Sequence, residues 1–165
     1  MAVAVAHDQS ALVFDLLGRL WLMPLSGGTP TPLTDPEGNA RLPRWSPDGK
    51  KILFQAYWTG TWQIYTINAD GTGLQQLTQG PYDHREPTWG PSGDTIYYAA
   101  DQTGNYDIWQ LDLDKKKSTN ITQQKFNQFA PAWHPERGLV YLSDDPDASG
   151  IVHVKAAEPR VLYAT

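Results

Sequence analysis

Short apolar runs alternate with turn-forming sequences along almost the whole chain. A typical run is KILFQAY at residues 51–57, which is rich in β-branched and aromatic side chains, as buried strands are. Turn sequences separate such runs, for example SPDG at 46–49 and ADGTG at 69–73, where proline presets one backbone angle and glycine permits another. Nowhere do apolar residues keep a helical period over three turns. The pattern predicts an all-β protein.

The strand pattern itself repeats along the chain. Three sets of landmarks recur with one spacing of 44 residues: Trp45, Trp89 and Trp133; Leu33-Thr34, Leu77-Thr78 and Ile121-Thr122; Leu20-Trp21, Ile64-Tyr65 and Ile108-Trp109. A period of about 40–45 residues with four short strands per repeat is typical of the blades of a β-propeller. We therefore expect blades of four antiparallel strands.

A weaker copy of the repeat begins the chain. Val3–Phe14 aligns with Pro43–Phe54 at an offset of 40, because the loop DLLGR is four residues shorter than QAYWTGTWQ. The sequence therefore predicts a single domain, residues 1–165, with four blades at about 1–36, 37–80, 81–124 and 125–165.

Some residues are expected to serve the repeat itself. These are the recurring tryptophans and one turn pair: Trp45, Trp89, Trp133, Asp48 and Gly49. A large flat side chain at one position of each blade can cover the facing sheet of the next blade. Trp58 and Trp62 do not recur and flank a turn, which leaves open an exposed binding role for them.

The repeats resemble those of TolB-type β-propellers. The likeness rests on WSPDG at 45–49, ILF at 52–54, IYTINADG at 64–71 and the closing Leu77-Thr78. The first blade followed by YDHREPTWGPSG at 82–93 is also similar to propeller regions that precede an amidohydrolase domain in larger bacterial proteins. Both resemblances imply a periplasmic or exported protein, although no signal peptide is visible at the start MAVAVA.

The family resemblance implies a ring of six or seven blades, and four blades fall short of it. We therefore expect an incomplete ring, with apolar faces at its ends that invite self-association or docking to missing blades. The alternative is a small closed ring of four blades, with Ala2–Ala6 packed near Val161–Tyr163.

Composition narrows the possible partners. The chain has 165 residues, 40% of them hydrophobic, and a net charge of −5, and its basic residues are scattered apart from Lys115–Lys117. No basic stripe is present to neutralise nucleic-acid phosphates, and no stretch has the ~18 apolar residues that a membrane helix needs. With no cysteine, disulfides and thiolate chemistry are excluded.

Signatures of catalysis are missing from the sequence. The four histidines are isolated, and neither a zinc-binding His-Glu-x-x-His nor the Gly-x-Ser-x-Gly of serine hydrolases occurs. An ion in the central channel, held by Asn39, Asp83, Glu86 and Asn127, is disfavoured because both carboxylates come from one blade. We expect no catalytic residue, no bound metal and no cofactor.

The residues that enter the first strand of each blade are the candidate binding surface. In a propeller this strand lines the central channel, so these residues lie at the channel rim. The candidates are Arg41, His84, Arg85 and Glu86, which are suited to a partner's chain termini or carboxylates. The simpler interpretation is that these polar residues only line a solvated channel rim and bind no partner.

Three functions are compatible with these features of the sequence. The favoured one is a non-catalytic TolB-like module that mediates protein or substrate contacts. The second is an accessory propeller of a bacterial amidohydrolase or peptidase whose catalytic domain is missing from this chain. The third, a self-contained metal-dependent enzyme, has the least support, and a propeller fold alone does not choose among the three.

Overall fold

The computed structural model describes residues 1–147, 150–155 and 158–164, with side chains described up to residue 147. The chain forms two compact units, Met1–Arg85 and Glu86–Thr165. Each unit is considered by itself below.

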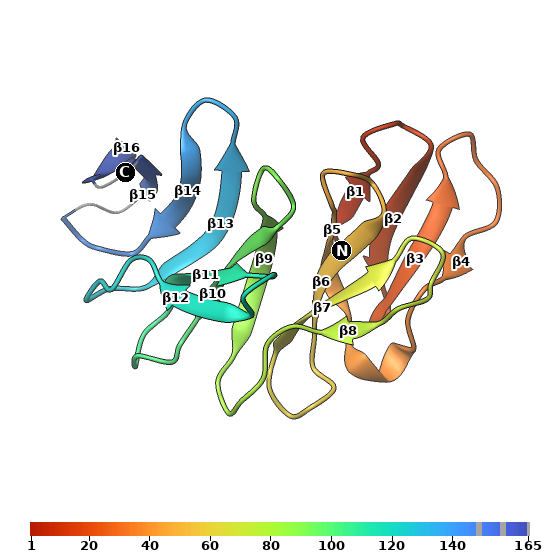
Figure 1. Cartoon of the computed structure of the whole chain (residues 1–165), viewed down its shortest axis with the longest axis horizontal. Helices are drawn as coiled ribbons and strands as arrows, with labels where there is room; N and C mark the ends of the chain where they lie inside the picture. Colours follow the sequence, from red (N-terminus) through yellow and green to blue (C-terminus); the bar gives the residue numbers. More distant parts are fainter. Residues whose placement is uncertain (148–149, 156–157, 165) are drawn as a thin grey trace. The chain divides into compact units, whose positions relative to one another are not determined.

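The first unit contains two sheets of four strands (Figure 1). Blade 1 consists of β1 (Val3–Val5), β2 (Ala11–Leu16), β3 (Arg19–Pro24) and β4 (Thr31–Pro32). Blade 2 consists of β5 (Arg41–Trp45), β6 (Lys51–Ala56), β7 (Gln63–Asn68) and β8 (Gln75–Gln76). Between the two blades lies a three-residue 3-10 turn, η1 (Pro36–Gly38), the only helical element in the described part of the chain.

The second unit holds the other two sheets, except that the first two residues of β9 belong to the first unit. Blade 3 consists of β9 (His84–Trp89), β10 (Thr95–Ala100), β11 (Asp107–Asp112) and β12 (Lys117–Asn120). Blade 4 consists of β13 (Gln128–His134), β14 (Gly138–Ser143), β15 (Gly150–Lys155) and β16 (Glu158–Ala164).

Within every sheet the strands follow one another in sequence order, as in the blades of a propeller. The prediction of an all-β, incomplete β-propeller built from four-stranded antiparallel blades is therefore confirmed. No helix among the described residues is long and apolar enough to cross a membrane.

The turn between the first two strands of blade 2 shows why the SPDG sequence folds as it does. The Ser46 hydroxyl donates to Asp48 Oδ1 at 2.6 Å, and the same oxygen accepts the Lys50 N–H at 3.1 Å. Gly49 has φ +70°, a left-handed conformation that costs glycine little. Asp48 and Gly49 thus close the hairpin.

The recurring tryptophan of blade 2 joins that blade to blade 1. Trp45 is 8% exposed, and its Nε1 donates to the Ala4 carbonyl oxygen in β1 at 3.1 Å. It belongs to a core that also contains Val13 and Leu20 of blade 1 and Ile52 of blade 2. The Trp45 side chain therefore packs between the two sheets and hydrogen-bonds one to the other.

The second unit repeats this arrangement. Trp133 of blade 4 stacks on Tyr97 of blade 3, with ring centroids 6.0 Å apart and planes 14° apart. Leu139 and Tyr141 are buried against Ala99 and Ile108 of blade 3. Trp89 occupies the equivalent place at the end of β9 and is 7% exposed.

A threonine closes each of the first three blades, which explains the recurring Leu-Thr and Ile-Thr pairs. The hydroxyls of Thr34, Thr78 and Thr122 accept the backbone N–H of Leu20, Ile64 and Ile108 at 3.0, 2.9 and 3.0 Å. The residue before each threonine donates its own N–H to the carbonyl of that same third-strand residue. The last strand is thus attached by backbone and side chain together.

Candidate functional site

One backbone contact brings the start of each new blade to the preceding blade. The N–H groups of Ala40, His84 and Gln128 donate to the carbonyl oxygens of Gly18, Trp62 and Tyr106 at 2.9, 2.8 and 2.7 Å. Each acceptor lies in the turn between the second and third strands of its blade. The rim residues predicted from the sequence are therefore held beside these turns.

At the turn of blade 2 this contact creates a cluster of cationic and aromatic side chains. The guanidinium carbons of Arg41 and Arg85 lie 5.7 and 5.5 Å from the ring centroid of Trp62. Tyr57, which is 46% exposed, meets Trp62 edge-on with centroids 5.5 Å apart. Arg41, Tyr57, Trp62 and Arg85 are called the cationic–aromatic cluster below, and all four belong to the first unit.

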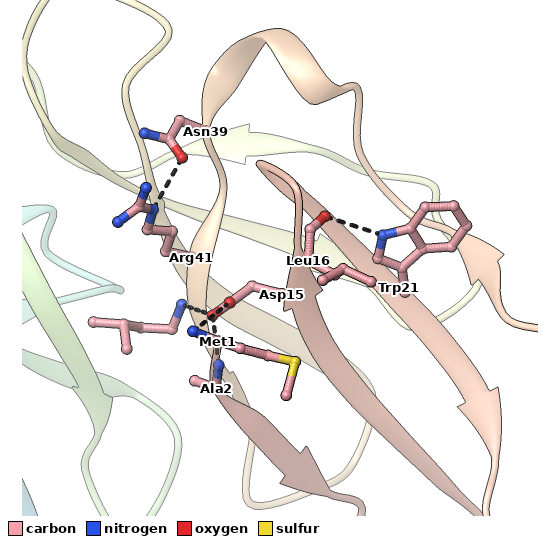
Figure 2. Close-up of polar contacts among 8 residues, drawn as sticks. Met1, Ala2, Asp15, Leu16, Trp21, Asn39 and Arg41 are labelled. Carbon is pink, nitrogen blue, oxygen red and sulfur yellow. Dashed lines mark hydrogen bonds and ion pairs between the residues drawn. The ribbon is translucent and has the colours of Figure 1, made fainter.

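The two arginines of the cluster have no counter-ion among the residues that the structure describes. Arg41 Nε donates to Asn39 Oδ1 at 2.9 Å (Figure 2), and Arg85 Nε is buried with no hydrogen-bond partner among the described residues. Stacked guanidinium groups keep donors free for a carboxylate or another anion.

His84 and Glu86, the other two predicted rim residues, are already engaged. His84 is 2% exposed, and its Nδ1 lies 3.1 Å from the Tyr82 carbonyl oxygen, to which it donates. Glu86 Oε2 accepts the backbone N–H of Ala130 at 2.6 Å. Neither side chain belongs to the cationic–aromatic cluster.

Two of the side chains considered for a channel ion, Asp83 and Asn127, accept hydrogen bonds from the backbone. Asp83 Oδ1 accepts the Trp62 N–H at 2.9 Å, and Asn127 Oδ1 accepts the Tyr106 N–H at 3.0 Å. Within the described ranges, no group of three histidine, aspartate or glutamate side chains is placed to hold a metal ion.

A buried carboxylate in blade 1 also has a structural role. Asp15 Oδ2 accepts the N–H groups of Ala2 and Leu42 at 3.1 and 3.0 Å, and Asp15 Oδ1 lies 3.5 Å from the amino terminus (Figure 2). Leu42 has φ +55° at a register shift in β5, so its N–H is turned out of its own ladder. Asp15 satisfies that donor.

Sequence reasoning found part of the cluster. It named Arg41 and Arg85, offered Trp62 together with Trp58, and did not single out Tyr57. Trp58 instead packs in the core, edge-on to Phe54 and Tyr65 with centroids 5.9 and 4.8 Å away. The available signal was that Trp62 is specific to its blade, since glycine and tyrosine stand at the equivalent positions 18 and 106.

A known family of propeller domains matches almost the whole of the chain. Residues 10–163 match the family described as TolB beta propeller domain. The chain belongs to this family. Among curated proteins, an uncharacterized protein of Agrobacterium fabrum is 36% identical over 70 residues, which cover 42% of this chain and 22% of that protein.

Solved structures show the same fold at low identity. A structure assigned to TolB from Agrobacterium tumefaciens has a TM-score of 0.83 at 22% identity, covering 98% of this chain and 64% of that one. TolB from Acinetobacter baumannii gives 0.73 at 19%, covering 97% and 40%. A puromycin-hydrolyzing peptidase from Mycobacterium tuberculosis gives 0.74 at 13%, covering 96% and 27%. This TolB-like chain thus spans less than two thirds of each of these proteins.

Proposed function

We propose that this TolB-like propeller is a non-catalytic binding module that contacts an acidic segment of a protein partner through its cationic–aromatic cluster. The observation that carries the proposal is the pair of guanidinium groups over the Trp62 ring, at 5.7 and 5.5 Å, with no counter-ion among the described residues. A cation stacked on an indole keeps its charge at a fixed place.

An acidic partner fits this surface in two ways. Carboxylates pair with guanidinium groups through charge-assisted hydrogen bonds, and the side chains of Tyr57 and Trp62 offer apolar area beside them. Tyrosine, tryptophan and arginine are also the residues that dominate the binding energy of many protein interfaces. The chain as a whole is acidic, with a net charge of −5, so the cluster is a local positive site on a negative molecule.

The test is fluorescence anisotropy with a labelled peptide of alternating glutamate and serine, and a matched lysine–serine peptide as comparison. We expect Arg41→Gln and Arg85→Gln each to weaken binding of the acidic peptide about tenfold, equivalent to ~1.4 kcal/mol for a lost charged contact. Binding should also weaken as salt is added.

Arg137→Gln is the matched control, since Arg137 is exposed and far along the chain in blade 4. It removes the same charge and should leave affinity unchanged. Equal binding of the lysine peptide, or equal affinity of all three variants, would contradict the proposal.

A second candidate function is supported by the likeness to the puromycin-hydrolyzing peptidase. This chain covers 27% of that protein, so it resembles one part of a larger hydrolase. In this alternative the propeller is an accessory domain that positions substrate for a peptidase or amidohydrolase domain. A catalytic domain encoded in frame beside this sequence would favour this alternative. Binding of the acidic peptide by the protein that contains both domains would also favour it.

The family resemblance also supports a periplasmic or exported location for the proposed module. Fractionation of the native organism, with antibody detection of this chain, tests it. Recovery with the cytoplasmic fraction would contradict it.

A further inference from the structure

The two faces of blade 1 differ in what covers them. Because side chains alternate along a strand, Ala4, Val13 and Leu20 point to one face, where they join the core shared with blade 2. The other face carries the residues between them. These are Val3, Val5, Leu12, Phe14, Trp21 and Met23, called the outer face of blade 1 below.

The outer face of blade 1 is a continuous apolar surface. Across the strands, Val3 pairs with Phe14 and Phe14 with Trp21, while Val5 pairs with Leu12 and Leu12 with Met23. Residues paired directly across an antiparallel sheet point the same way, so all six lie together. None of the six is buried, and Val3 and Val5 are 58% and 48% exposed.

The same face of blade 2 is fully covered. It consists of Trp45, Ile52, Phe54, Tyr65 and Ile67, which are 8%, 0%, 0%, 4% and 2% exposed. The cover is blade 1, because these residues share one core with Ala6, Val13 and Leu20. The residues that the structure describes form no such cover over the corresponding surface of blade 1.

Blade 4 carries the complementary unused surface. Leu139 and Tyr141 of β14 pack against blade 3 and are 4% and 3% exposed. Val140 and Leu142 alternate with them and point to the other side, and Leu142 is 43% exposed. Ala132, which pairs with Val140, is also exposed. Ala132, Val140 and Leu142 are called the outer face of blade 4.

We propose that the outer face of blade 1 is a docking surface for the outer face of blade 4 of a second copy of this chain. In both described joints, a later blade packs its tryptophan-bearing face on the far face of the blade before it. Among the described residues, blade 1 presents an uncovered surface of the first kind and blade 4 one of the second kind, so a contact between these two surfaces in different copies is head-to-tail. This proposal is independent of the acidic-peptide site, since it uses none of the cluster residues.

Sedimentation velocity of the purified chain over a concentration series is the first measurement. We expect the mass-average size to rise with concentration, because the two different surfaces join heterologously. Val5→Glu places a charge in the outer face of blade 1, and Leu142→Glu places one in the outer face of blade 4. Each alone should weaken self-association tenfold or more.

The decisive experiment mixes the two variants. A Val5→Glu copy keeps an intact blade 4 face, and a Leu142→Glu copy keeps an intact blade 1 face, so an equimolar mixture should form a one-to-one complex that neither variant forms alone. Leu74→Glu is the matched control, because Leu74 is 53% exposed in the turn before β8. It should associate like the unchanged protein. A melting curve of each variant checks that it is folded.

Two outcomes would overturn the proposal. One is an unchanged protein that stays monomeric at every concentration, as a chain closed on itself would. The other is association that Val5→Glu abolishes and Leu142→Glu leaves intact, which would mean that two blade 1 faces pair with each other.

Discussion

At the scale of single residues, the first position of the third strand is a buried polar residue in both blade 2 and blade 3, but its hydrogen bonds differ. In blade 3 it is Asp107, which is 1% exposed and accepts hydrogen bonds from Thr103, Asn120, Thr122 and the backbone of Gln124 at 2.6, 2.8, 2.8 and 3.1 Å. In blade 2 it is Gln63, whose amide both accepts and donates. The carboxylate can only accept, so blade 3 surrounds it with donors.

These donors lower the pKa of the Asp107 carboxyl. Burial alone would raise the pKa of Asp107, but the four hydrogen bonds outweigh burial and hold the pKa below its ordinary value of 3.8. A carboxyl whose pKa is lower in the folded state stabilises the fold above its unfolded-state pKa, and this contribution is lost as the pH falls through the folded-state value. We expect Asp107→Asn to lower the free energy of unfolding by about 1–3 kcal/mol at neutral pH.

The difference between the unchanged protein and Asp107→Asn should shrink as the pH is lowered below 4, measured by urea unfolding at a series of pH values. Asp114→Asn is the control, since Asp114 is exposed in the turn between β11 and β12. It should leave the curve unchanged. A loss that stays constant with pH would show that the charge of Asp107 is not what stabilises the blade.

The residue scale also marks where sequence reasoning stopped. Trp58 and Trp62 look alike in the sequence, four residues apart on either side of Gly60. Gly38 explains why only Trp58 packs in the core: a Cβ at position 38 would lie 1.9 Å from Trp58 Nε1. The indole of Trp58 therefore fills a space that only glycine leaves, in a turn twenty residues earlier. Such a long-range fit is invisible to local pattern.

At the scale of elements, the closing threonines link strands that would otherwise be weakly held. β8 has only two residues, so Thr78 is important for its attachment. We expect Thr78→Val to lower the free energy of unfolding by about 2 kcal/mol, because it leaves the Ile64 N–H without its acceptor and Gln63 Oε1 without the Thr78 donor. The loss of stability is measured as a lower midpoint of urea unfolding, with an unchanged dependence of the unfolding free energy on urea concentration.

Thr78→Ser keeps the hydroxyl and should retain most of the stability. Similar losses for valine and serine would mean that the methyl group, and not the hydrogen bonds, accounts for the effect.

Strands and turns were predictable because their causes are local. The apolar residues of β6 favour a strand, and the SPDG sequence favours a turn, without help from distant residues. The 44-residue repeat then assigns these elements to blades. The candidate site was less predictable from the sequence than the strands and turns. Arg41 and Arg85 were identified by their alignment with the rim, but the burial of His84 and the bond from Glu86 to Ala130 depend on packing. A polar residue at the start of a strand does not reveal whether it faces solvent or its neighbour.

At the scale of the whole molecule, we expect the purified chain to hydrolyse no ester, lactone or peptide. Its only fully buried histidine among the described residues, His84, faces a backbone carbonyl and not a nucleophile, and the sequence lacks the serine hydrolase elbow. Chromogenic esters and a labelled peptide library test this. Turnover that copurifies with the chain and disappears in Glu86→Ala would contradict the expectation.

The recurring left-handed residue of the first strand has a consequence for how such chains can evolve. Leu42, Glu86 and Ala130 have φ of 55°, 54° and 48°. The freed N–H of Leu42 is satisfied by Asp15 of blade 1, and that of Ala130 by Glu86 of blade 3. In these two joints the first strand of a blade therefore depends on an acidic side chain of the blade before it. Exchange of blade 2 or blade 4 alone by recombination would separate a donor from its acceptor, whereas exchange of blades 1 and 2 as a pair, or of blades 3 and 4 as a pair, would keep the two together.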